Sequence, residues 1–117
     1  MPKPLGPYTP IVRAGDWLIT SGQIGLVGDG NLAPGGIDGE TRQAIRNVAS
    51  LLEAEGASLA DVRKTLVFLR HMRDFSQMNE AYADEFGDTR PARTCVAVVE
   101  LPAVALVEIE AWAYVGD

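Results

Sequence analysis

Short apolar runs alternate with glycine-rich and polar stretches along this chain, and their spacing predicts its elements. Residues 11–24 fit two short strands joined by a turn at Ala14-Gly15-Asp16. From Gly25 to Gly39, glycines and a proline interrupt the apolar pattern, which predicts a loop. The loop lacks Lys and Ser/Thr at the spacing that a phosphate-binding loop requires, so we expect a plain connection.

The middle of the chain has the pattern of a helix followed by a buried strand. Apolar side chains recur at helical spacing over about residues 40–55, with Asp38 as the expected N-terminal cap and Gly56 as the end. Residues 62–69 are rich in β-branched and aromatic side chains, which favours a strand that is covered on both faces.

A second amphipathic helix is predicted at about residues 75–86. Asp74 and Gln77 have the spacing of a capping box at its start, and Gly87 marks its end. The predicted order is strand, strand, helix, strand, helix, strand, strand.

The last quarter of the chain predicts a pair of strands that carries charges at positions that should be covered. Along the second of these strands, one alternating set is small and apolar: Ala105, Val107, Ile109, Ala111, Ala113 and Val115. The other set mixes carboxylates with large apolar side chains: Val104, Leu106, Glu108, Glu110, Trp112 and Tyr114. This second set is too apolar to face water over a whole sheet.

The chain has 117 residues and a mass of 12.5 kDa, which leaves room for one domain over residues 1–117. Two helices are too few to cover both faces of the sheet, so we expect them on one face. We therefore predict an α+β fold with a five- to six-stranded, mostly antiparallel sheet. Another subunit should cover the second face, as in a closed ring of identical subunits.

Composition argues against several classes of function. The net charge is −6, and no basic run is long enough to follow a phosphate backbone, which argues against a nucleic-acid partner. Met1-Pro2-Lys3-Pro4 is not followed by a signal-peptide stretch, and no apolar run is long enough to span a membrane, so we expect a cytoplasmic protein. One cysteine and one histidine, His71, leave little from which to build a metal site.

Arg93 is the first candidate for chemistry, because a guanidinium fork held at a strand entrance after Pro91 suits an anionic ligand. The alternative is an interface salt bridge with an acidic side chain. Cys95 lies two residues on and should point to the same side. It is otherwise a small buried apolar residue, and it has no partner base that would make it a nucleophile.

Glu108 should face the predicted subunit interface, where burial would raise its pKa and suit it to move a proton or orient a water. The alternative is that Glu108 or Glu110 pairs with an arginine across the interface. Trp17 and Trp112 are expected in the core or in an interface.

Three further positions have a weaker case. Tyr8 precedes the first strand, where its hydroxyl could reach a neighbouring pocket or simply pack. In Ser21-Gly22-Gln23, the glycine either lets a ligand approach the backbone or forms a bulge. Asn79 lies one position off the apolar stripe of the second helix, where a solvated surface residue is the alternative.

Several motifs in one order resemble the reactive-intermediate deaminase family, also called Rid or YjgF. The resemblance covers nearly the whole chain. It rests on Gly6-Pro7-Tyr8, Thr20-Ser21-Gly22-Gln23, Lys64-Thr65-Leu66-Val67-Phe68, Phe75 to Tyr82 with Asn79 inside it, Pro91-Ala92-Arg93-Thr94-Cys95-Val96, Leu101-Pro102 and Val107-Glu108-Ile109-Glu110-Ala111.

The resemblance implies a chorismate-mutase-like α+β fold and a homotrimer with ligand sites in the clefts between subunits. It also implies cofactor-free hydrolysis of 2-imino acids, or their enamine tautomers, to 2-keto acids and ammonia. By resemblance, Arg93 binds the substrate carboxylate and Glu108 orients the attacking water. The implied substrate-binding residues are Tyr8, Ser21, Gly22, Asn79 and Cys95.

Two other functions compete with the 2-iminopropanoate/2-iminobutanoate deaminase. The first is a non-catalytic module that binds a 2-keto acid in the same clefts. The second is a ribonuclease, which is weaker because the chain is acidic and lacks a His or Lys pair.

Overall fold

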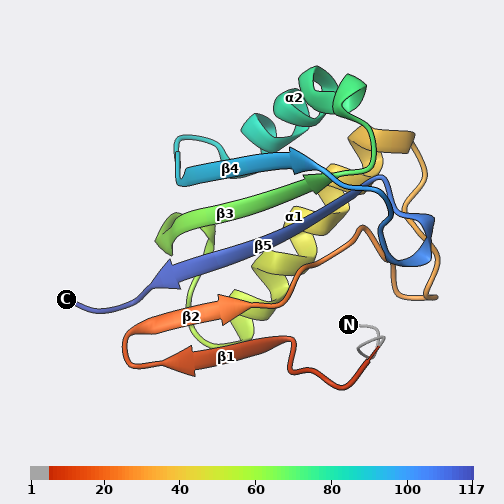
Figure 1. The fold of residues 1–117 in the computed structure, drawn as a ribbon. Coiled ribbons are helices and arrows are strands. Elements are labelled where there is room, and N and C mark those ends of the chain that lie inside the picture. The colour runs from red at the N-terminus through yellow and green to blue at the C-terminus, as the bar shows by residue number, and fades with distance from the viewer. Residues whose placement is uncertain (1–5) are drawn as a thin grey trace.

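The computed structural model describes residues 6–117, and Met1 to Pro4, which bear on the signal-peptide expectation, lie outside them. The described chain forms one five-stranded sheet and two α-helices (Figure 1). The strands are β1 (Ile11–Ala14), β2 (Trp17–Thr20), β3 (Val62–Leu69), β4 (Ala92–Ala97) and β5 (Val107–Tyr114). The helices are α1 (Gly36–Ala54) and α2 (Phe75–Phe86), with short 3₁₀ turns at Leu59–Asp61, Met72–Asp74 and Pro102–Val104.

The strand order is β1-β2-β5-β3-β4. Three of the four pairings are antiparallel and the β3–β4 pairing is parallel, which confirms the predicted α+β class and mostly antiparallel sheet. The predicted pairing of the last two strands with each other is wrong, because β3 lies between β4 and β5 and pairs with both. The segment between these strands carries the chain across the end of β3, where the Val98 N–H donates to the Leu69 carbonyl at 2.9 Å.

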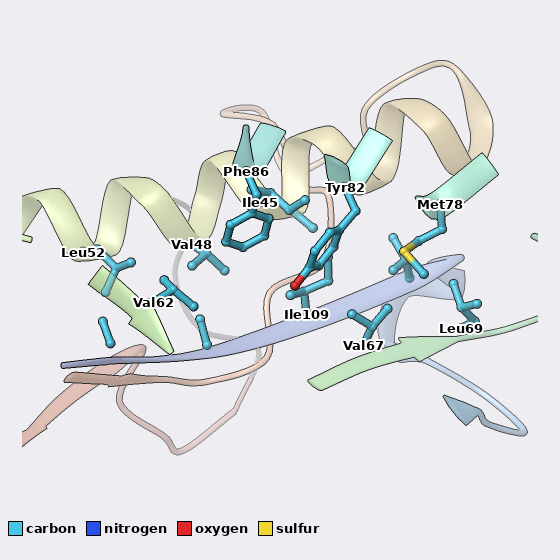
Figure 2. Close-up of a cluster of buried hydrophobic side chains, with 14 of the residues drawn as sticks. Ile45, Val48, Leu52, Val62, Val67, Leu69, Met78, Tyr82, Phe86 and Ile109 are labelled. Atoms are coloured by element: carbon cyan, nitrogen blue, oxygen red, sulfur yellow. The ribbon is translucent and has the colours of Figure 1, made fainter. Parts of the chain in front are cut away.

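Both helices cover the same face of the sheet, as predicted (Figure 1). Alternate residues of β5 are buried beneath them, so the small apolar set faces the helices. Figure 2 shows the core between helices and sheet, where Ile45, Val48 and Leu52 of α1 meet Val62, Val67 and Ile109 from the strands. The prediction that residues 62–69 are covered on both faces is wrong for a single chain, because Leu66 and Phe68 on the other face are only half-buried.

We call the side of the sheet without helices the open face. Its residues, read from strand register and alternation, include Val12, Trp17, Ile19, Leu66, Phe68, Val96, Glu108, Glu110, Trp112 and Tyr114. Trp17 contacts Trp112 and Tyr114 edge-on, with ring centroids 6.4 and 5.1 Å apart. Trp17 and Trp112 are exposed, so they do not belong to the core of this chain.

Helix α1 begins at Gly36 and not near residue 40, because Gly35 and Gly36 take positive φ angles of 104° and 63° that turn the chain into the helix. The extra turn buries Ile37, and it needs a glycine at position 39, where the Pro34 carbonyl oxygen occupies the place of a Cβ. Asp38 therefore lies inside the first turn. It pairs with Arg42 at 3.1 Å and does not cap the helix.

Helix α2 has the predicted bounds, and Gly87 ends it with a φ of 63°. The predicted capping box of Asp74 and Gln77 does not form, since the Asp74 side chain makes no capping hydrogen bond. The 3₁₀ turn at Met72–Asp74 runs directly into the helix, and the Phe75 N–H donates to the Met72 carbonyl instead.

None of the helices in residues 6–117 combines the length and apolar character needed to cross a membrane.

Candidate active site

Arg93 lies on the helix side of β4, the edge strand of the sheet. It is paired in register with the buried Thr65 of β3, and neighbours in register point to the same face. Its guanidinium carbon lies 5.0 Å from the centre of the Tyr82 ring and 5.6 Å from that of Phe75. Helix α2 thus holds the Arg93 cation against two aromatic rings, whose faces attract a positive charge.

Among residues 6–117, no oxygen atom accepts a hydrogen bond from the Arg93 guanidinium. Its one recorded hydrogen-bond contact runs from Nη1 to the Met78 sulfur at 4.0 Å, which is a weak interaction. Figure 2 shows Met78 and Tyr82 reaching from α2 toward the sheet. A guanidinium that is half-buried and without a carboxylate is suited to receive an anionic ligand.

A groove of about 280 Å³ lies beside Arg93, between the second half of α2 and the entrance of β4. It is lined by Asn79, Tyr82, Ala83, Arg90, Pro91 and Arg93. Asn79 is half-buried, and its Oδ1 is buried without a hydrogen-bond partner among the described residues. The structure therefore brings Asn79 and Arg93 to the same groove. Among the described residues, the Arg93 guanidinium has no oxygen acceptor and the buried Asn79 Oδ1 has no donor.

Cys95 points to the same side as Arg93, in register with the buried Val67, and it packs against the core. Burial raises the pKa of its thiol, and the positive charge of Arg93 only partly opposes this rise. A raised pKa keeps the sulfur protonated near neutral pH, so it is a poor nucleophile.

Glu108 lies on the open face of β5, in register with Phe68. Burial raises the pKa of its carboxyl group, and the neighbouring Glu110 raises it further. Gly22 lies directly beside it: a Cβ built on Gly22 would lie 2.5 Å from Glu108 Oε2 and 2.9 Å from its Cγ. The absent side chain at position 22 therefore makes room for the Glu108 carboxylate.

The segment after β2 is fixed by backbone hydrogen bonds to β5. Gln23 and Ile109 exchange both of theirs, at 2.8 and 2.9 Å. The Ser21 hydroxyl donates to the Thr9 carbonyl at 2.6 Å, which ties the N-terminal segment to this point. Tyr8 follows in that segment with 46% of its surface exposed. Ser21, Gly22 and Glu108 thus form one group, and Tyr8 lies in the segment that Ser21 holds.

Arg93 and Glu108 do not meet within one chain. Glu108 is level with Val96, because both pair with Phe68, and two strand spacings of about 4.8 Å each separate β5 from β4. The two side chains also point to opposite faces of the sheet. The predicted site residues of one chain therefore form two separate groups, which we call half-sites. Arg93, Cys95 and Asn79 lie on the helix side, and Glu108, Gly22 and Ser21 lie on the open face.

The chain is similar to known proteins over nearly its whole length. A sequence profile of the family described as Endoribonuclease L-PSP, which is the Rid/YjgF family, matches residues 1–115. The chain belongs to the Rid/YjgF family. A RutC family protein of Pyrococcus horikoshii is 47% identical over 97% of this chain and 90% of its own length. A mouse 2-iminobutanoate/2-iminopropanoate deaminase is 40% identical over 98% of this chain and 86% of its own.

A solved structure of Escherichia coli TdcF with bound serine is also similar to this Rid/YjgF chain. Its TM-score is 0.89 at 37% identity, and the match covers 97% of this chain and 91% of that one. The similarity supports the fold described above over nearly the full length of both chains.

Sequence reasoning missed two features of this Rid/YjgF site. Arg90 lines the same groove as Arg93, yet an arginine in a loop carries no periodic signal that would single it out. Tyr82 ends one of the motifs above but has no predicted role of its own, although its ring lies against the Arg93 guanidinium. Its hydroxyl is 2.7 Å from the Thr65 hydroxyl, which satisfies its buried polar end.

Proposed function

We propose that this protein is an imine deaminase that hydrolyses 2-iminopropanoate, 2-iminobutanoate or their enamine tautomers to 2-keto acids and ammonia. The observation that carries the proposal is the pair of half-sites. Arg93 offers an unclaimed guanidinium for the substrate carboxylate, and Glu108 offers a carboxylate of raised pKa beside a glycine. Deaminases that bear this substrate in their names are 39–41% identical to the chain, which supports the same chemistry.

The two half-sites require a second copy of the chain. We propose a homotrimer in which the open face of one subunit meets the β4 edge of the next, so that Arg93 of one subunit and Glu108 of its neighbour enclose one cleft. Exposed aromatic side chains on the open face support this arrangement, since Trp17 and Trp112 keep 36% and 37% of their surface in the single chain. A closed ring would provide one such cleft at each subunit contact.

The proposed reaction needs no covalent intermediate. Arg93 holds the substrate carboxylate in a bidentate contact, which fixes the imine carbon relative to the neighbouring Glu108. A water held by Glu108 adds to the carbon of the protonated imine, its C–O bond forming as the C=N electrons move to nitrogen, and Glu108 takes up the proton. Glu108 then returns this proton to nitrogen, and the C–N bond breaks as the carbinolamine hydroxyl passes its own proton to Glu108, which gives the 2-keto acid and ammonia. Ammonia takes that proton from Glu108 and leaves as ammonium.

The raised pKa of Glu108 suits this role, because a carboxylate with a higher pKa is a stronger base. Cys95 contributes its backbone and packing in this scheme, and its protonated sulfur takes no part in bond making.

The proposal is tested by competition with a chemical trap. A pyridoxal-phosphate dehydratase acting on serine or threonine generates the imine, and semicarbazide traps whatever is not hydrolysed first. Wild type should lower semicarbazone formation, and Arg93→Ala should reduce this effect by about 100-fold or more because the carboxylate is no longer held.

Arg46→Ala is the matched control, since Arg46 lies on the outer side of α1 and pairs with Glu85. Its activity should equal that of wild type. If wild type leaves the trapped product unchanged while calorimetry detects Arg93-dependent binding of 2-oxobutanoate, the protein is a binding module and the proposed enzyme is wrong.

We do not propose a ribonuclease, although the family description carries that word. The chain has a net charge of −6 and a single histidine, His71, which directly precedes the 3₁₀ turn before α2 and makes no side-chain capping hydrogen bond. Neither property favours binding or cleavage of a polyanion.

A further inference from the structure

The groove beside Arg93 contains a second cation, Arg90. Both side chains line the same space of about 280 Å³, together with Asn79, Tyr82 and Pro91. A ligand that is anchored at Arg93 can therefore extend along the same groove toward a second positive charge.

The Arg90 side chain is held by two hydrogen bonds, and its other N–H groups form none with the described residues. Its Nη1 donates to the carbonyls of Gly87 and Thr89, just past the C-terminus of α2, where the helix dipole favours a cation. A guanidinium has five N–H donors. Within residues 6–117, the donors on Nε and Nη2 of Arg90 have no recorded acceptor.

Neither arginine of the groove has a carboxylate partner among the described residues. The ion pairs recorded there belong to Arg42 and Arg46, which join α1 to Asp38, Asp84 and Glu85. Two unpaired guanidinium groups in one groove of an acidic chain favour a ligand with two negative charges.

Tyr82 lies in the groove with both cations, and its ring centre is 5.0 Å from the Arg93 guanidinium carbon. Burial raises the pKa of the Tyr82 hydroxyl, and the positive charges of Arg93 and Arg90 both partly oppose that rise.

We propose that Arg90 binds a second carboxylate, so that this protein prefers 2-imino dicarboxylic acids over 2-iminopropanoate and 2-iminobutanoate. The inference rests on the proposed function, in which Arg93 holds the carboxylate next to the imine. The side-chain carboxylate then extends along the groove, over Pro91 and the Tyr82 ring, to the free donors of Arg90. The reaction itself is unchanged: water replaces the imine nitrogen, and ammonia leaves.

The test compares two imines in the same trapping assay. D-Aspartate oxidase acting on D-aspartate or D-glutamate supplies the dicarboxylic imine, and D-amino-acid oxidase acting on D-alanine supplies 2-iminopropanoate. Wild type should have the higher kcat/KM for the dicarboxylic imine. Arg90→Gln should lower the dicarboxylic-to-monocarboxylic ratio of kcat/KM by about 10- to 100-fold, as loss of a hydrogen bond between charged groups predicts.

Glutamine at position 90 keeps an N–H donor for the Gly87 carbonyl, so the end of α2 should stay intact, and the melting temperature checks this. Arg46→Gln is the matched control and should leave the ratio unchanged. If wild type hydrolyses 2-iminopropanoate but Arg90→Gln leaves the ratio unchanged, the inference is overturned and the proposed function stands. If wild type hydrolyses neither imine, the proposed function itself fails.

Discussion

Gly22 determines where the Glu108 carboxylate lies, and it does so by having no side chain. A Cβ at this position would lie 2.5, 2.7 and 2.9 Å from Oε2, Cδ and Cγ of Glu108. Contacts this short force the carboxyl group to move. Gly22 does not have the positive φ that would itself demand glycine, so alanine is compatible with the backbone. The three shortest contacts of a substituted side chain are therefore all with Glu108.

Gly22→Ala should lower kcat/KM for imine hydrolysis by about 100-fold, because displacing a catalytic group by about 1 Å has that effect. Its melting temperature should stay close to that of wild type. Gly28→Ala is the matched control, since a Cβ there meets no atom within 4 Å and the backbone does not require glycine. Wild-type activity of Gly22→Ala would show that the position of Glu108 does not limit the reaction.

At the residue scale, the sequence predicted candidate site residues where a charged side chain interrupts an apolar pattern. Arg93 and Glu108 were found because each is a charge within an apolar strand. The contact between Gly22 and Glu108 could not be found in this way, since it joins β5 to a segment 86 positions earlier in the chain. Arg90 lies in a loop, where a charged residue is ordinary and predicts nothing.

Helix α1 positions the strand that carries Glu108. Glu40 of α1 is only 6% exposed, and its Oε1 accepts the Leu106 N–H at 2.9 Å, just before β5. Asn47, two turns further along the same face of α1, donates to the carbonyls of Ile24 and Leu26, both at 3.0 Å, just after Gly22. Two buried polar side chains of one helix thus hold the backbone on both sides of the Glu108 half-site.

Burial raises the pKa of Glu40, the Leu106 N–H partly opposes this, and Asp74 adds to the rise. A carboxyl group whose pKa is higher in the folded state contributes stability below its unfolded pKa of about 4.3 and loses that contribution as pH rises through the folded pKa. Glu40→Gln keeps an oxygen acceptor for Leu106 but cannot ionise. The melting temperature of Glu40→Gln relative to wild type should therefore increase from pH 4 to pH 7.5.

The matched control for this experiment is Glu53→Gln, an exposed carboxylate on the same helix. Its melting-temperature difference from wild type should change little over the same range. A constant difference between Glu40→Gln and wild type at every pH would show that ionisation of Glu40 is not linked to folding.

At the element scale, local patterns predicted most elements, and long-range pairing was the weak point. The alternation along β5 correctly predicted which residues face the helices, because side chains on a strand alternate by a period of two. Nothing local to β4 and β5 indicates that β3 separates them. The early start of α1 was missed for a similar reason: it depends on the Gly35–Gly36 backbone and on the approach of Pro34 to Gly39.

At the scale of the whole molecule, the proposed active site belongs to no single chain. Arg93 and Glu108 lie on opposite faces of the sheet, two strands apart. A site that joins them must take one residue from each of two subunits. Two inactive variants should therefore restore each other's activity in mixed trimers, because a contact between them can bring the intact Arg93 of one to the intact Glu108 of the other.

Arg93→Ala and Glu108→Gln, co-expressed with different tags and purified as mixed trimers, should recover activity that neither has alone. In a mixed trimer of either composition, one of the three clefts receives both intact residues, so about a third of wild-type activity is expected. Sedimentation should give the mass of a trimer. The control pairs Glu108→Gln with the Arg93→Ala/Glu108→Gln double variant, which supplies no intact Glu108 and should stay inactive. Mixed trimers of the two single variants without activity would mean that one cleft does not combine Arg93 and Glu108 from neighbouring subunits.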